Sequence, residues 1–89
     1  MSVYLITYDL NKIGKNYEGL LKAIEDYPAW WHYMKNCWLI STNQTYNEVF
    51  NKLKPHMDDG DNLLIIEVTK NYIGWLDQKA WDWMKDMIK

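Results

Sequence analysis

The stretch VYLITYD, residues 3–9, is rich in β-branched and aromatic side chains, which favour an extended strand. Both alternating sets of side chains in it are largely apolar. A strand with this pattern is typically covered on both faces. The stretch ends in a carboxylate, Asp9, at the junction with the next loop.

The residues that follow predict a helix and then a hairpin. Apolar side chains recur at helical spacing over residues 17–27, and Pro28 ends this helix. Residues 29–34 and 37–42 are β-prone runs separated by two polar residues, so we expect two strands joined by a tight turn.

A second helix and a further strand come next. Thr45 and Glu48 have the spacing of a capping box, and the helix that they start runs to Pro55. After an acidic turn at residues 58–62, the run LLIIEVT, residues 63–69, predicts a strand. Its central apolar positions favour a middle place in the sheet.

The last part of the sequence predicts a third amphipathic helix. Asp77 is placed to cap it, and residues 71–75 before it form a connection or a short fifth strand. The apolar side chains on its broad face are Ala80, Trp81, Met84, Met87 and Ile88.

The predicted order is βαββαβ followed by a helix, which fits one domain of the α+β class over residues 1–89. Two right-handed crossovers close this order into an antiparallel sheet with two helices on one face, which is the ferredoxin-like fold. The strands around Ile6 and Ile65 are apolar on both sides. The second face therefore needs a cover, either the terminal helix or a second subunit.

Composition points to a partner. Apolar residues make up 48% of the 89 residues, and six Trp and seven Tyr are more than the interior of a small monomer needs. We therefore expect some aromatic side chains at a homodimer interface or at a surface that binds another protein.

Charge and cysteine content narrow the classes of function. The net charge is −2 and the ten basic residues are all lysines, which counts against nucleic-acid binding because phosphate recognition favours arginine. The single Cys37 rules out an intrachain disulfide and a cysteine-based zinc site. No apolar run has membrane length and residues 1–12 lack the pattern of a signal peptide, so we expect a cytoplasmic protein with no membrane association.

The stretch YLITYDL together with the order of elements resembles the small CRISPR-associated adaptation endonucleases and the VapD-type toxin ribonucleases. The segments DLNKIGKNY, WWHYM, CWLI, LLIIEV and NYIGWL more closely resemble short bacterial and phage proteins of a SinR-type family, which as a group lack an assigned activity. No helix-turn-helix pattern accompanies that resemblance.

The endonuclease resemblance implies a role for Asp9. In that family the aspartate that ends the first strand binds metal, with two copies facing each other across a dimer. Mg²⁺ held in this way suits phosphodiester hydrolysis. The family's basic segments are represented here by Lys12, Lys15 and Lys22, which nearby acidic residues offset.

The residues themselves leave other interpretations open. Asp9 is either a metal ligand and catalytic group or a side chain that accepts hydrogen bonds from loop amides and shapes the turn. Glu67, among apolar neighbours in its strand, is either a salt-bridge partner or a second metal ligand beside Asp9. His32 and His56 lack a second ligand at motif spacing, and the acidic turn at residues 58–62 lacks the spacing of a calcium loop.

Three functions remain in view. The first is a non-catalytic dimeric module that binds a protein or acts in regulation, and the second is a Mg²⁺-dependent nuclease with Asp9 at its site. The third is a binder of nucleotides or single-stranded nucleic acid that uses Lys12, Lys15 and the exposed Trp75. The net negative charge favours the non-catalytic module over the two functions that involve nucleic acid.

Overall fold

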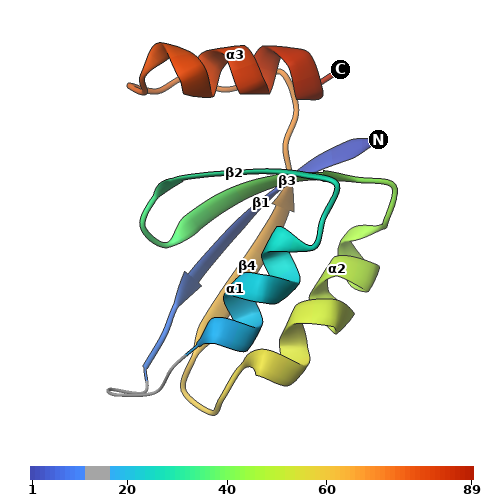
Figure 1. The fold of residues 1–89 in the computed structure, drawn as a ribbon, viewed down its shortest axis with the longest axis vertical. Helices are drawn as coiled ribbons and strands as arrows, with labels where there is room; N and C mark the ends of the chain where they lie inside the picture. Colours follow the sequence, from blue (N-terminus) through green and yellow to red (C-terminus); the bar gives the residue numbers. More distant parts are fainter. Residues whose placement is uncertain (12–16) are drawn as a thin grey trace.

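The computed structural model describes residues 1–11 and 17–89. Within them a four-stranded sheet lies between two helices on one side and one helix on the other (Figure 1). In chain order the elements are β1 (Ser2–Asp9), α1 (Glu18–Glu25), β2 (Ala29–Met34), β3 (Cys37–Thr42), α2 (Tyr46–Leu53), the 3-10 turn η1 (Lys54–His56), β4 (Asn62–Glu67) and α3 (Gln78–Met87).

The strands are ordered β2-β3-β1-β4, and every neighbouring pair is antiparallel. This α+β arrangement is consistent with a ferredoxin-like fold. The prediction that residues 63–69 form a middle strand is wrong, because β1 lies between β3 and β4 and leaves β4 at the edge. The apolar side chains of β4 therefore cannot be explained by a central position in the sheet.

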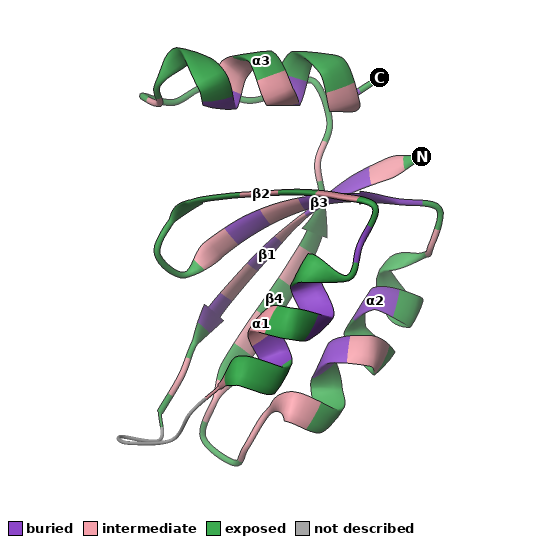
Figure 2. Ribbon diagram, viewed as in Figure 1, coloured by how far each residue is buried: buried purple, intermediate pink, exposed green. Residues whose placement is uncertain are grey.

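One face of the sheet carries the main core. Side chains of β1 that point to this face pack against α1 and α2, and Ile6, Leu20, Ile24, Ile40 and Leu53 are completely or almost completely buried. This burial is the main source of stability for the two short helices, since isolated helices of eight residues are unstable in water. Figure 2 shows that buried residues alternate with exposed ones along both helices.

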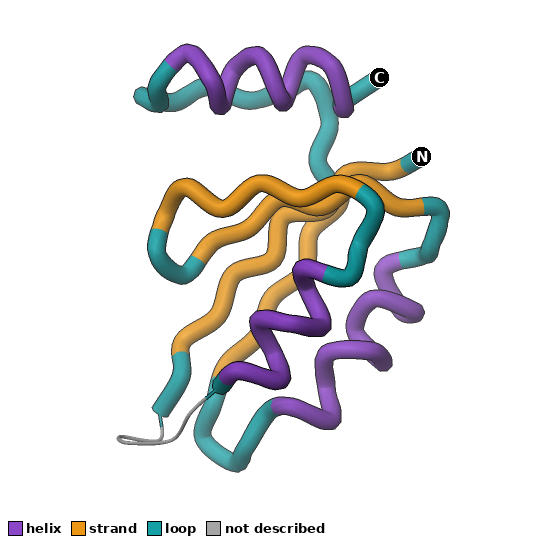
Figure 3. The backbone as a smooth tube through the Cα atoms, in the orientation of Figure 1, coloured by secondary structure: helices purple, strands orange, loops and turns teal. Residues whose placement is uncertain are grey.

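The opposite face of the sheet is covered by α3 at one end only. Val3, Met84 and Ile88 are buried there, and Leu39 and Val68 pack against them. The tube in Figure 3 shows that α3 lies apart from α1 and α2, across the sheet. The terminal helix thus supplies part of the cover that the sequence requires, and the rest of this face is largely uncovered by residues 1–11 and 17–89.

Several local predictions are confirmed. The Thr45 hydroxyl accepts a hydrogen bond from the Glu48 amide at 3.2 Å, and the Glu48 carboxylate accepts one from the Thr45 amide at 3.0 Å. Asp77 caps α3 by accepting a hydrogen bond from the Ala80 amide at 3.2 Å. The hairpin forms with Met34 opposite Cys37.

The connection between β4 and α3 is irregular, so the fifth strand that was one alternative for residues 71–75 does not form. No helix among the described residues has the length and apolar content that crossing a membrane requires.

Candidate functional site

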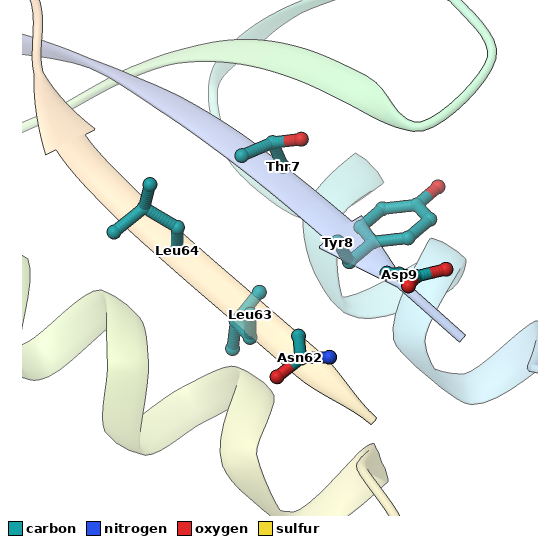
Figure 4. A pocket seen from close by; sticks show the side chains of 6 residues that line it. All are labelled: Thr7, Tyr8, Asp9, Asn62, Leu63 and Leu64. Carbon is teal, nitrogen blue, oxygen red and sulfur yellow. The ribbon is translucent and has the colours of Figure 1, made fainter. Parts of the chain in front are cut away.

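Asp9 lies at the end of β1, opposite Asn62 of β4, and its side chain is exposed. These two residues and Leu64 help to line an open hollow of about 370 Å³ (Figure 4). Among the described residues the Asp9 carboxylate accepts no hydrogen bond. The exposed carboxylate is free to meet a ligand from outside, but among the described residues it belongs to no group of three or more His, Cys, Asp or Glu side chains.

The side chain that ties this end of the molecule together is Asp61. Its carboxylate accepts hydrogen bonds from the Asn11 amide at 2.7 Å and the Asp58 amide at 2.8 Å. The Tyr17 hydroxyl donates to it at 3.0 Å. The sequence indicated only an acidic turn at residues 58–62, whereas in the structure Asp61 joins the end of β1 and the residue before α1 to the turn before β4.

Gly60 allows this turn to form. Its φ of +86° is in the left-handed region, which favours glycine. A Cβ atom there would also come within 2.7 Å of the Asn11 side-chain nitrogen. The Gly60-Asp61 pair could have predicted a turn stabilised by the Asp61 side chain, because glycine followed by a short hydrogen-bond acceptor is common in turns.

Glu67 does not join Asp9. The register of the β1–β4 pair sets Glu67 opposite Tyr4 and Asp9 opposite Asn62. Five residues of strand separate those positions, which is about 16 Å. Glu67 is also exposed rather than buried among apolar neighbours, so it needs no partner charge. Two ligands from these positions cannot hold one ion within a single chain.

The remaining candidate ligands are scattered. His32 stacks on Trp38 with ring centroids 3.7 Å apart, and its Nε2 lies 3.0 Å from the Lys35 carbonyl. His56 packs against Gly19 of α1, where an added Cβ would lie 2.8 Å from its ring. No group of three or more His, Cys, Asp or Glu side chains gathers within residues 1–11 and 17–89. Lys12 and Lys15, the predicted binding lysines, lie outside the described residues.

Tyr8, at the rim of the same hollow, belongs to the core. Burial raises the pKa of its hydroxyl, although a hydrogen bond from Trp38 Nε1, 3.0 Å away, lowers it in part. A tyrosine held neutral in this way supports packing rather than acid–base chemistry near pH 7.

The uncovered part of the sheet presents apolar side chains to solvent. Leu64 and Ile66 of β4 are 53% and 48% exposed, and they lie on the face opposite α1 and α2. Ile66 is the register neighbour of Leu5, so this patch continues inward along the sheet. The apolar character of β4 on both faces therefore reflects an uncovered surface.

The connection that leads into α3 adds to this surface. Ile73 and Trp75 are each 99% exposed, in agreement with the expected exposure of Trp75. Tyr72 stacks on Trp81 at 5.9 Å, which holds the start of the connection against α3. We define the open apolar surface by its most exposed members: Leu64, Ile66, Tyr72, Ile73 and Trp75.

The hairpin and α3 also meet near this connection. The charge of Asp77, together with a hydrogen bond to its carboxylate, raises the pKa of Tyr33. The start of α3, which Asp77 caps, therefore lies near Tyr33 of the hairpin.

No protein-family model matches the sequence, and none of the curated proteins matches it.

Proposed function

We propose that this chain is a non-catalytic protein-binding module that works as a homodimer through the open apolar surface. The observation that carries the proposal is the exposure of Leu64, Ile66, Ile73 and Trp75 on one side of the sheet. Large contiguous apolar surface on a small protein is typical of an interface. Interfaces are also enriched in aromatic residues, and Tyr72 and Trp75 belong to this surface.

The charge distribution supports the same function. The chain as a whole has ten lysines against twelve acidic residues and no arginine. A nucleic-acid interface requires clustered positive charge, whereas a protein interface has a core depleted in charge.

The ferredoxin-like class and the resemblance to short bacterial and phage proteins of the SinR type are part of this proposal. The strand order and the helix placement support the class, and the segments quoted above support the resemblance. A cytoplasmic location agrees with a single cysteine that forms no disulfide.

A Mg²⁺-dependent nuclease is the second candidate. The observation that favours it is the exposed Asp9 carboxylate at the rim of the 370 Å³ hollow. This function requires a second Asp9 from a partner, since Glu67 lies at the other end of the strand pair.

Light scattering tests the first proposal. We expect a molar mass of twice 10.8 kDa for the purified protein at tens of micromolar, since specific interfaces of standard size hold at such concentrations. A mass of 10.8 kDa throughout that range would contradict the homodimer.

A further inference from the structure

An apolar cavity lies between the uncovered face of the sheet and the connection that leads into α3. Its volume is about 260 Å³, and Leu5, Leu39 and Cys37 form part of the wall on the sheet side. Tyr72 and Leu76 line the opposite side, with one side chain from α3. Among the described residues no charged side chain lines it.

Two polar groups of the wall, from Cys37 and Trp38, have partners elsewhere. Cys37 Sγ donates to Thr7 Oγ1 at 3.4 Å, and Trp38 Nε1 donates to the Tyr8 hydroxyl at 3.0 Å. A water molecule needs two or more polar partners to occupy a buried site. The cavity therefore suits an apolar occupant.

The size of the cavity matches an aromatic side chain of two rings. The cavity is partly open to solvent. For comparison, an enclosed apolar cavity of about 150 Å³ accommodates benzene. A cavity of about 260 Å³ has room for the larger indole of tryptophan.

Trp75 supplies such an indole in the same connection that lines the cavity. It is 99% exposed, and it lies between residues that line the cavity, Ile73 and Leu76. The other five Trp side chains are each less than 40% exposed. Trp81 Nε1 donates to the Leu76 carbonyl at 3.0 Å, which holds the connection in place while the Trp75 side chain projects into solvent.

We propose that two copies of this chain exchange Trp75, so that the indole of each copy fills the cavity of the other. This inference rests on the homodimer of the proposed function and names its central contact. The same segment carries the projecting side chain and part of the cavity wall. A two-fold axis can therefore make both contacts at once, as a closed dimer requires.

The area that this contact would bury agrees with a dimer. Each Trp buries about 150–250 Å² and covers a similar area of cavity wall. The exposed Ile73 and Tyr72 beside it bring the total toward the roughly 800 Å² per partner of a standard interface.

Two substitutions test the exchange from its two sides. Trp75→Ala removes the projecting indole, and Cys37→Phe places a ring inside the cavity. Each should raise the dimer dissociation constant about 100-fold or more, as truncation of a central Trp does in other interfaces. Tyr46→Ala is the matched control, because Tyr46 is a 58% exposed aromatic side chain on α2, and it should leave the dissociation constant unchanged. Sedimentation equilibrium measures all three, and circular dichroism and melting temperature verify that each variant is folded.

Mixing the two impaired variants provides the decisive measurement. The Trp75→Ala chain keeps an open cavity and the Cys37→Phe chain keeps its Trp75. An equimolar mixture can therefore make one of the two contacts, and we expect it to form more dimer than either variant alone at the same total concentration.

The outcomes separate this inference from the proposed function. A wild-type dimer that persists in Trp75→Ala, or a mixture no more dimeric than its components, would overturn the exchange and leave the homodimer standing. A monomeric wild type would overturn both. If Cys37→Phe fails to fold, Trp75→Ala alone decides, because an exposed side chain can be removed without disturbing the core.

Discussion

At the scale of single residues, Asp61 and Asp9 lie at the same end of the sheet and differ in their hydrogen bonding. Asp61 accepts from two backbone amides and one hydroxyl. We expect Asp61→Ala to lower the free energy of unfolding by about 2 kcal/mol, because it leaves these donors without their acceptor. Urea unfolding measures the change, with Asp59→Ala as the control because Asp59 is an exposed neighbour in the same turn. Equal effects of the two substitutions would show that the tie contributes little.

Asp9→Asn distinguishes the binding module from the nuclease. The exposed carboxylate accepts no hydrogen bond among the described residues, so the substitution should change the free energy of unfolding by less than about 0.5 kcal/mol. Mg²⁺ or Mn²⁺ should leave the melting temperature of the wild-type protein unchanged. A metal-dependent rise that disappears in Asp9→Asn, together with loss of RNA or DNA cleavage, would instead establish the nuclease.

Tyr27 makes stability depend on alkaline pH. Burial, and then the charge of Glu48, raises the pKa of its hydroxyl to about 12. The folded state thus disfavours the ionised form of Tyr27. The contribution of the neutral hydroxyl to the free energy of unfolding is therefore complete below about pH 10, the ordinary tyrosine pKa. It is lost as the pH rises toward about 12. We expect the free energy of unfolding to fall over this window, and to fall less steeply in Tyr27→Phe. Parallel pH profiles for the two proteins would contradict this origin.

At the scale of elements, the start of α2 is the clearest case of a helix fixed by its own sequence. Thr45→Ala removes the hydroxyl that accepts from the Glu48 amide, and we expect it to cost about 1 kcal/mol of unfolding free energy. Asn47→Ala, in the same exposed turn, is the control and should have little effect. Chemical denaturation of both variants measures the difference, and dimer formation should be unaffected, since Thr45 lies outside the open apolar surface.

At the scale of the whole molecule, the open apolar surface continues from the connection onto edge strand β4. Leu64→Lys puts a charge on this surface without disturbing the core, because Leu64 is 53% exposed. We expect a several-fold weaker dimer with an unchanged melting temperature at low protein concentration. Phe50→Lys on α2, where Phe50 is 40% exposed, is the matched control. Equal dimer affinity in both variants would place the interface elsewhere.

The sequence by itself determined the local structure, because the interactions that decide it join near neighbours. The capping box needs residues three apart, Asp77 caps a helix that begins at the next residue, and the hairpin joins adjacent strands. The α+β class and the need for a cover on the second face also followed from alternation and spacing. The exposure of Trp75 was predicted from its place beside Gly74 in a connection.

Only the tertiary structure decided how distant parts of the chain meet. An apolar strand has the same sequence pattern whether a neighbour or a partner covers it, so β4 was predicted as central and lies at the edge. The separation of Asp9 from Glu67 depends on strand register, and the tie made by Asp61 joins residues 50 positions apart. The cavity beside Trp75 likewise arises where α3 stops short of covering the sheet, and no local pattern encodes that packing.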